Sequence, residues 1–248
     1  MIARAVAGLP EIARRADVAA LILERATPAA GDIVVVAHKA ISKAEGRVRL
    51  LVEIEPGAQA RRLAGQLDGG KDARHVQAIL DESAEIVRCA HGVLICRTHH
   101  GFVCANAGVD GSNTARADEL VLLPEDPDAS ARELRARLRE ALGGQPLAVL
   151  VTDSFGRAWR HGQCDVAIGA AGLQPLEDWR GRRDSRGQEL QATWIALADE
   201  IAGAADLARA KDSREPVVIV SGLARHVINA DGPGAGALLR SAAEDLFR

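Results

Sequence analysis

Residues 147–172, LAVLVTDSFGRAWRHGQCDVAIGAAG, join an apolar run to a polar, glycine-rich segment. The first five residues of this stretch are apolar, which predicts a buried strand. A carboxylate and a hydroxyl, those of Asp153 and Ser154, follow where this strand is expected to stop. Ligands commonly bind at the ends of such strands in α/β proteins, so the stretch predicts a polar site at the edge of a sheet.

Further apolar runs, bounded by turn residues, predict strands that begin near Asp32, Arg47, Gly92 and Pro216. Their alternation with helical patterns is typical of a parallel α/β sheet. The connections are irregular, however, and strand-like runs at residues 92–98 and 101–108 follow each other closely. A mixed α+β arrangement fits at least as well, and the pattern alone leaves both open.

Helices are predicted over residues 58–67, 73–89, 126–144 and 189–210. In the third of these, Asp126 is expected to cap the first turn, Pro127 to open the helix and Gly143 to close it. The fourth is alanine-rich, and its expected buried stripe consists of Trp194, Leu197, Ile201 and Leu207. No repeat or linker divides the sequence, so we expect a single domain over residues 1–248 and place no boundary between subdomains.

Composition limits the classes of partner. The chain has 248 residues and a formal net charge of −3, which implies no general affinity for nucleic acid or anionic membranes. Aromatic residues make up 2% of the chain, which argues against stacking on single-stranded nucleic acid. The cysteines form no CxxC pair, so a zinc site or a disulfide framework is disfavoured. No apolar run reaches the ~20 residues of a membrane helix, and the first segment is too charged for a signal peptide. We therefore expect a cytoplasmic protein with no nucleic-acid and no membrane partner.

A near match to a phosphate-binding P-loop occurs at residues 65–72. Gly65, Gly70 and Lys71 have the required spacing, but Asp72 stands where Ser or Thr would reach Mg²⁺. The residues before this segment have a helical pattern, so a surface turn between two helices is the better interpretation.

The strand predicted from Asp32 ends at His38 and Lys39, and Ser42 and Lys43 follow closely. Cations and a hydroxyl at a strand end, with free backbone N–H groups nearby, can bind phosphate. An exposed turn whose lysines are only solvated explains the same residues, and both interpretations stay open.

Asp110 lies in a run of small, turn-forming residues, ANAGVDGSN (residues 105–113), after an apolar strand. Its carboxylate is a hard oxygen ligand suited to Mg²⁺ or Mn²⁺. Alternatively, the carboxylate caps its own backbone in an Asx-turn. The neighbouring pair His99 and His100 looks like a metal or base motif, but adjacent residues of a strand face opposite sides and cannot chelate one ion together.

Asp153 and Ser154 suit Mg²⁺ and nucleotide phosphates, and Arg157 and Arg160 can pair with phosphate oxygens. A structural ion-pair network is the alternative interpretation of these residues. Together with Asp110, their composition and spacing predict a metal–phosphate site for phosphoryl chemistry, without identifying the substrate.

Longer segments of the chain resemble one family, the coenzyme F420-0:L-glutamate ligases, which are gamma-glutamyl ligases of a deazaflavin coenzyme. The matching segments are GLPEI (8–12), ISKAEGR (41–47), HGFVCANAGVDGSN (100–113), LPEDPDASA (123–131), VTDSFGRAWRHGQCDVAIGAAGLQPLEDWRG (151–181), ADEIAGAADL (198–207) and EDLF (244–247). They are in order and span nearly the whole chain, so we expect the standalone form of the family.

The resemblance implies a GTP-dependent acid–amino-acid ligase. A carboxylate on the lactyl-phosphate tail of F420-0 would take the γ-phosphoryl group of GTP. The amine of L-glutamate would then displace phosphate and form an amide, and later rounds would add γ-linked glutamates. The resemblance further implies two divalent ions (Mg²⁺ or Mn²⁺), stimulation by K⁺, and an intertwined homodimer with an unusual α+β fold of mixed sheets and packed helices.

By position, the resemblance assigns the first metal to Asp110 and Asp153 and the second to Ser154 and Lys211. We expect the catalytic residues to be Asp110, Asp153, Arg157 and Arg160. The expected nucleotide contacts are Leu9, Pro10, Glu11, Ile12, His38, Ser42, Lys43, Asn113 and the loop Arg209, Ala210, Lys211, Asp212, Ser213, Arg214, Glu215, Pro216.

The chain departs from the family pattern at a few positions. Ser154 replaces a Thr and keeps the hydroxyl, while Ala158 replaces a Pro, Cys164 a Thr and Ala210 a Gly. Two alternatives to the family reaction remain: a diverged ligase that uses another amino acid or tail variant, and a non-catalytic protein that binds a nucleotide or a deazaflavin.

Overall fold

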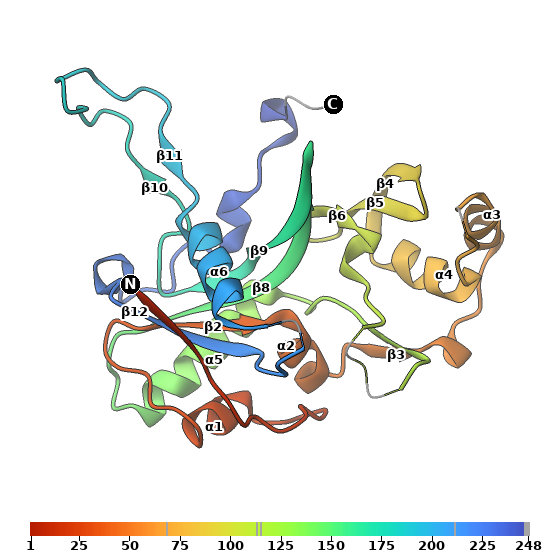
Figure 1. Cartoon of the computed structure of the whole chain (residues 1–248), viewed down its shortest axis with the longest axis horizontal. Coiled ribbons are helices and arrows are strands. Elements are labelled where there is room, and N and C mark those ends of the chain that lie inside the picture. Colours follow the sequence, from red (N-terminus) through yellow and green to blue (C-terminus); the bar gives the residue numbers. More distant parts are fainter. Residues whose placement is uncertain (68, 113, 115, 211, 246–248) are drawn as a thin grey trace.

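A mixed β-sheet forms the centre of the molecule (Figure 1). The computed structural model describes residues 1–67, 69–112, 114, 116–210 and 212–245. The strand order in the central sheet is β1-β12-β2-β8-β9. Its strands are β1 (Ile2–Ala5), β2 (Ile33–Ala37), β8 (Ala148–Arg157), β9 (Arg160–Ala171) and β12 (Val217–Ser221). β2 and β8 run parallel, whereas the other neighbours in this sheet are antiparallel.

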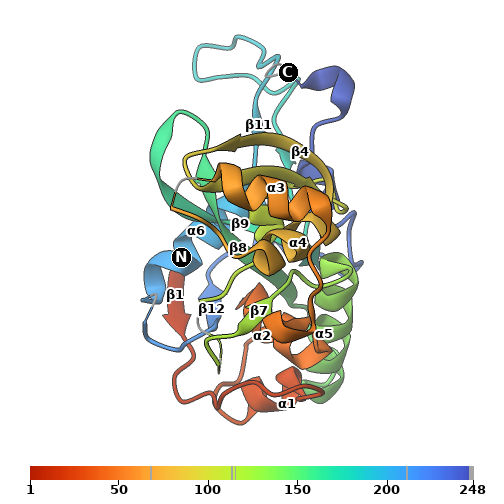
Figure 2. The same cartoon turned by 90° about the vertical axis from the view of Figure 1, so that its right-hand side faces the viewer.

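Helices cover both faces of this sheet, which explains why its inner strands are continuous runs of Val, Ile and Leu. On one face lie α1 (Val18–Leu23), α2 (His38–Glu45) and α5 (Pro127–Ala141), packed against alternate residues of β2 and β8 such as Val34 and Val149. The opposite face is covered by α6 (Leu197–Ala208), which packs against the intervening residues such as Val35 and Leu150. Figure 2 shows α6 on one side of the sheet and α2 and α5 on the other.

A smaller part of the molecule has a hydrophobic core of its own. It contains α3 (Ala58–Gln66), α4 (Ala73–Asp81) and a sheet of β4 (Ser83–Ala90), β5 (Val93–Thr98) and β6 (Val103–Ala105). The ribbon of β3 (Val48–Leu50) and β7 (Glu119–Val121) connects this part to the central sheet (Figure 1). Within the described residues, this core is separate from those on the two faces of the central sheet.

A thin arm formed by residues 176–196 projects from the body (Figure 1). It contains the short antiparallel strands β10 (Glu177–Asp178) and β11 (Trp194–Ile195). The guanidinium of Arg180 lies 4.2 Å from the ring centre of Trp194, and that of Arg182 lies 4.8 Å from the ring centre of Trp179. Short 3₁₀ turns complete the described elements: η1 (Leu51–Glu53), η2 (Asn106–Gly108), η3 (Ala224–His226), η4 (Ala235–Leu238) and η5 (Ala242–Glu244).

The predicted α+β class is confirmed, and so are most of the predicted strands. The helix predicted over residues 126–144 is confirmed as α5, whose first turn is capped by the carboxylate of Asp126 (2.8 Å from the backbone nitrogen of Ala129). Gly143 follows the helix with φ 70°, a conformation that glycine adopts without strain. Among the described helices, none is both long and apolar enough to cross a membrane.

Some predicted boundaries are wrong. The helix expected over residues 189–210 is shorter, because Trp194 pairs with Asp178 in the arm. Trp194 and Leu207 are 50% and 91% exposed, so they do not belong to the predicted buried stripe, whereas Leu197 and Ile201 do. The helix expected over residues 73–89 ends at Asp81, and β4 begins at Ser83. β8 does not stop before Asp153 but continues to Arg157, because it pairs with β9 along this length.

Candidate functional site

The first turn of α2 lies beside the polar half of β8. In the sheet, Ala37 at the end of β2 pairs with Thr152 of β8. The residues that follow these two, His38 and Asp153, are therefore neighbours. His38 Nε2 lies 3.4 Å from Asp153 Oδ1, and His38 Nδ1 lies 3.3 Å from the hydroxyl of Ser42. Because His38 and Ser42 are buried, the interpretation of this segment as an exposed turn is wrong.

Lys39 brings Asp110 to the same helix turn. Its ammonium group donates to Asp110 Oδ2 (2.6 Å) and to the Ser112 hydroxyl (2.7 Å). The backbone of Asp110 bridges to Val121, and the Ser112 N–H donates to Asp110 Oδ1 (2.7 Å), so the predicted Asx-turn is present. Burial alone would raise the pKa of Asp110, but the bonds from Lys39 and Ser112 outweigh it and hold the pKa below its usual value. Asp110 and Asp153 therefore contact consecutive residues of α2.

A buried carboxylate that the sequence analysis missed lies on the opposite face of β8. Asp165 on β9 is 2% exposed and accepts hydrogen bonds from Thr152 Oγ1 (2.9 Å) and Ser154 Oγ (2.6 Å). Arg209 pairs with the same carboxylate and also donates to Thr152 Oγ1 (3.1 Å). Asp165 therefore fixes the side chains of Ser154, an expected metal ligand, and Arg209, an expected nucleotide contact. Its signal in the sequence is an acid inside an otherwise apolar strand pattern.

The donor set around α2 can be tested against a divalent cation. Asp110 and Asp153 offer hard carboxylate oxygens, which Mg²⁺ and Mn²⁺ prefer. Among the described residues, no group of three or more His, Cys, Asp and Glu side chains could hold a metal ion. Mg²⁺ usually takes one or two protein carboxylates together with water and substrate phosphates, rather than a cage of protein ligands alone. An ion held by Asp110 and Asp153 alone would therefore need further oxygen ligands from water or from a bound phosphate.

The segment with residues 9–12 lies along α2. Ile12 is buried, Leu9 packs against the same core, and Glu11 is exposed and forms an ion pair with Lys43. The structure thus places Lys43 next to this segment, on the helix that also carries His38.

The segment that follows α6 returns to the same end of the sheet. Its last residue, Pro216, accepts a hydrogen bond from the backbone N–H of Ala37 (2.8 Å). Ser213 Oγ donates to the Ala210 carbonyl (2.9 Å) and accepts from the Glu215 N–H (3.2 Å), and Arg214 has φ 60°. Asp212 also lies in this segment. Lys211 and Asn113, an expected metal ligand and an expected nucleotide contact, lie outside the described residues.

Arg157 and Arg160 are not brought to the carboxylates. They pair with each other across the tip of the β8–β9 hairpin and are exposed. Arg157 is four residues beyond Asp153, which corresponds to about 13 Å along a strand. Its guanidinium donates to the His161 carbonyl (2.7 Å).

The other candidate motifs have structural partners. The near P-loop is a turn between α3 and α4, as predicted, and Asp72 caps α4. Lys71 is half-buried and donates to the Asn106 side chain (3.0 Å), and burial lowers its pKa. His99 and His100 contact different backbone carbonyls, those of Asp81 (3.1 Å) and Pro124 (2.9 Å).

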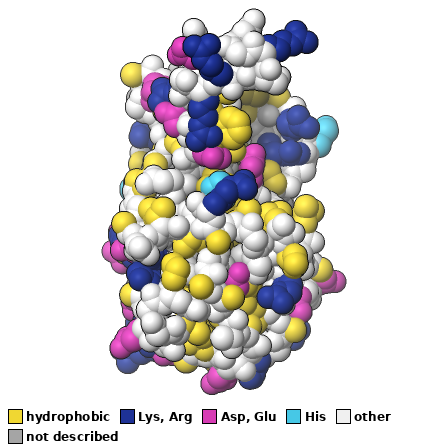
Figure 3. All heavy atoms as spheres, turned by 90° about the vertical axis from the view of Figure 1, so that its left-hand side faces the viewer, with side chains coloured by type: hydrophobic (Ala, Val, Ile, Leu, Met, Phe, Trp, Pro, Cys, Tyr) yellow, Lys and Arg dark blue, Asp and Glu magenta, His cyan; other side chains and the backbone are white. Residues whose placement is uncertain are grey.

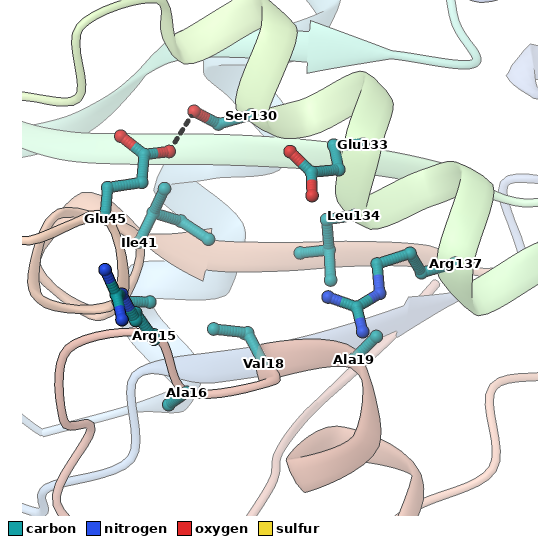
Figure 4. Close-up of a pocket in the computed structure, with 11 residues that line it drawn as sticks. Arg15, Ala16, Val18, Ala19, Ile41, Glu45, Ser130, Glu133, Leu134 and Arg137 are labelled. Carbon is teal, nitrogen blue, oxygen red and sulfur yellow. Dashed lines mark hydrogen bonds between the residues drawn. The ribbon is translucent and has the colours of Figure 1, made fainter.

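A cavity of about 230 Å³ lies at the other end of α2, between this helix, α1 and α5. Figure 4 shows Glu45 and Glu133 along one side of it and Arg15 and Arg137 along the other, with Glu45 accepting a hydrogen bond from Ser130. Asp110 and Asp153 are not among the residues that line it.

The fold and the geometry define an α+β protein in which paired carboxylates and basic side chains gather at the first turn of one helix. Residues 8–222 match the family model of the F420-0:Gamma-glutamyl ligases. The chain is similar to the coenzyme F420:L-glutamate ligase of Methanopyrus kandleri, with 47% identity over 94% of this chain and 91% of the relative. It is also similar to the proteins of the same description from Methanothermobacter thermautotrophicus (42% identity over 98% and 97%) and Halobacterium salinarum (43% over 100% and 96%). The chain belongs to the F420-0:gamma-glutamyl ligase family.

Proposed function

We propose that this protein joins L-glutamate to coenzyme F420-0 in a GTP-dependent reaction of F420 biosynthesis. Family membership and the names of the similar proteins support the glutamate ligation. The observation that carries the proposal at the level of the site is that Asp110 and Asp153 contact consecutive residues, His38 and Lys39, at the first turn of α2. A site for a metal-bound nucleotide needs carboxylates to hold the metal ion and cations to balance the charge of the phosphates.

The proposed reaction has two steps. A carboxylate oxygen of F420-0 attacks the γ-phosphorus of GTP, the bond from this phosphorus to the β,γ-bridging oxygen breaks, and GDP leaves. The amine of L-glutamate then attacks the acyl phosphate, loses a proton, and displaces inorganic phosphate to form the amide. Activation by phosphorylation is needed because a free carboxylate does not offer a leaving group to an amine.

The residues of this chain bind and orient the reactants. Asp110 and Asp153 would hold a first divalent ion, Mg²⁺ or Mn²⁺. Ser154, whose hydroxyl lies on the opposite face of β8 beside Asp165, would be a ligand of a second ion. Bound ions would spread the charge of the transferred phosphoryl group and align it with the attacking oxygen. His38 contacts Asp153 and Lys39 contacts Asp110, so each positions one carboxylate.

The nucleotide would extend along α2 from these carboxylates. Lys43 contacts Glu11 of residues 9–12 on this path, and Pro216 lies at the end of β2, where its carbonyl accepts from the Ala37 N–H. Cations near the phosphates are what a triphosphate requires, and the helix N-terminus adds favourable backbone dipoles. Stimulation by K⁺, a homodimeric state and a cytoplasmic location complete the proposal and rest on the family resemblance.

Ligation is tested with purified protein, GTP, Mg²⁺, F420-0 and L-glutamate, followed by mass spectrometry of the deazaflavin product and assay of GDP and phosphate. We expect one GDP and one phosphate for each glutamate added, and no product when any component is omitted. Product without GTP would overturn the nucleotide dependence. Product with another amino acid but not with L-glutamate would identify a diverged ligase, and nucleotide binding without any product would identify a non-catalytic binder.

A further inference from the structure

The tip of the β8–β9 hairpin projects beyond the rest of the central sheet (Figure 1). Residues 156–163, GRAWRHGQ, are all exposed, although they lie at the meeting point of two paired strands. Trp159 at this tip is 81% exposed. Trp159 is not a member of any of the described hydrophobic cores, so most of its indole surface is open to a ligand.

The backbone of Trp159 adds to this observation. Its φ is 57°, in the left-handed region that glycine prefers and that a bulky side chain rarely adopts. Such strain costs on the order of 1 kcal/mol or more and is typical of functional sites. A glycine at this position would adopt the same conformation without strain.

The charge of the tip is entirely positive. Arg157 and Arg160 flank Trp159, His161 follows, and residues 156–163 contain no acid. Figure 3 shows basic side chains and a histidine gathered where this hairpin projects, at the upper right of the view. The bond from Arg157 to the His161 carbonyl fixes one guanidinium at the tip. An aromatic face between guanidinium groups is suited to a ligand with a planar ring and an anionic group.

The acceptor of the proposed reaction has these groups in a defined order. Its reacting carboxylate belongs to a lactyl phosphate, and a sugar-alcohol chain separates that phosphodiester from the deazaflavin ring. About ten bonds lie between the carboxylate and the ring, a span of about 12 Å when extended. Along the hairpin the order is Asp153, then Arg157 about 13 Å further along the strand, then Trp159, which lies in the turn just beyond Arg157 because Arg157 pairs with Arg160. A carboxylate that reacts several ångströms from Asp153 would place the phosphodiester near Arg157 and the ring near Trp159.

We propose that the β8–β9 tip recognises the acceptor, with Trp159 stacked on the deazaflavin ring and Arg157 and Arg160 paired with the phosphodiester. This inference rests on the proposed function and assigns the part of the protein that selects its acceptor. The tip binds and orients F420-0 and takes no part in the transfer of the phosphoryl group.

The test measures binding of F420-0 by quenching of deazaflavin fluorescence, without GTP or glutamate. Trp159→Ala is expected to raise the Kd for F420-0 about tenfold, as removal of one stacking platform does. Trp159→Phe should keep most of the affinity, because it retains an aromatic face. Trp194→Ala, which removes another exposed tryptophan in the arm, is the matched control and should leave the Kd unchanged.

A second ligand separates the two contacts. This ligand is the deazaflavin alcohol, which has the ring and the sugar-alcohol chain but lacks the phospholactate and therefore has no phosphodiester. Trp159→Ala should weaken the binding of both ligands, whereas Arg157→Gln should raise the Kd for F420-0 about tenfold and leave the Kd for the deazaflavin alcohol unchanged. Circular dichroism and the Tm of each variant report on folding, and the exposed tip predicts no change in either.

The outcomes distinguish this inference from the proposed function. If Trp159→Ala binds F420-0 as the parent does, the inference is overturned while ligation stands. If the parent binds F420-0 through Trp159 but forms no amide, the proposed function fails and the inference stands. Trp159→Ala could also change the oligomeric state measured by sedimentation. If F420-0 binding then returns when the oligomer is restored, the tip is a contact between two copies of the chain and the inference is overturned.

Discussion

His38 and Lys39 are neighbours in the chain, yet their side chains reach carboxylates from different parts of the molecule. Successive residues of a helix point about 100° apart, so one helix turn can contact two elements at once. His38 contacts Asp153 of the central sheet, whereas Lys39 contacts Asp110, which follows the smaller sheet. The first turn of α2 therefore contacts both carboxylates and sets their positions.

Asp153→Asn tests the importance of one carboxylate. The amide keeps the size of the side chain and an oxygen that can accept from the Ser154 N–H, but it removes the negative charge that would hold a cation. We expect GTP turnover to fall by a factor on the order of 100 or more, with a Tm close to that of the parent. Asp184→Asn in the exposed arm is the control and should keep full turnover. Parent-like turnover of Asp153→Asn would contradict the metal assignment.

Glu45 gives a prediction for the dependence of stability on pH. Burial raises the pKa of its carboxyl, the Ser130 hydroxyl opposes this, nearby Glu133 adds to it, and Arg47 opposes it. The folded protein therefore binds this proton more tightly than the unfolded chain does. The associated stability is fully present below pH 4.5, the usual pKa of the group, and is lost as the pH rises through the folded-state pKa.

Glu45→Gln removes this ionisation while keeping an oxygen that can accept from Ser130. At pH 7 the variant should have a higher free energy of unfolding than the parent, by less than about 1 kcal/mol because the group is only half-buried. The difference should vanish below pH 4.5. Thermal unfolding at pH 4 and pH 7 measures it, with Glu24→Gln, an exposed carboxylate, as the control. A Tm advantage that grows toward acid would refute the assignment.

At the scale of elements, strands and helices with local signals were predictable from the sequence. β2, β12 and α5 have apolar runs or capping residues within their own segments, so no distant partner is needed to recognise them. The outer half of β8 is different, because Gly156 and Arg157 have low strand propensity and are held by pairing with β9. For this reason the sequence predicted the end of β8 too early, before Asp153 instead of at Arg157.

The same distinction applies to the candidate site. Asp110 and Asp153 were identifiable as candidates because each follows an apolar run. Their approach to one helix was not predictable, because it depends on the pairing of Ala37 with Thr152 and on the bridge between Asp110 and Val121. Register between distant segments is not encoded in any short stretch of sequence.

The turn η2, which precedes Asp110, is a tightly fitted element. Asn106, Ala107 and Gly108 have consecutive φ values of 53°, 53° and 72°. A Cβ on Gly108 would lie 2.6 Å from Cγ of the buried Leu123. Neither the backbone conformation nor the packing leaves room for a side chain at this position.

Gly108→Ala should therefore destabilise the protein by about 2–4 kcal/mol, which combines the clash and the backbone strain. A Tm lower by roughly 5–15 °C is expected for a chain of this size, together with reduced turnover because Asp110 is displaced. Gly65→Ala in α3 is the matched control, since a Cβ there meets nothing within 4 Å. That change should leave turnover intact and stabilise slightly, by about 0.5–1 kcal/mol. A Gly108→Ala protein as stable as the parent would show that η2 is not so closely packed.

At the scale of the whole molecule, the proposed site lies where two separately packed parts meet. Asp153 belongs to the central sheet, whose faces are covered by α2 and α6, whereas Asp110 follows the sheet of the smaller part. Each part has its own core, so the contacts between them at α2 are few compared with those inside each part. A ligand that holds both carboxylates would therefore couple the two parts and stabilise the entire chain.

This coupling predicts a thermal shift. A ligand that binds only the folded state at a concentration of about 100 times its Kd adds about 2.7 kcal/mol to the free energy of unfolding, or roughly 5–10 °C in Tm for a chain of this length. We expect this rise with GTP and Mg²⁺ together and a much smaller one with GTP and EDTA, because the carboxylates repel an unneutralised triphosphate. In Asp110→Asn the shift caused by Mg²⁺ and GTP should shrink by at least half, while the control Asp184→Asn should keep it. An equal shift with and without EDTA would mean that the nucleotide binds independently of the ion, and the joint role of Asp110 and Asp153 would have to be abandoned.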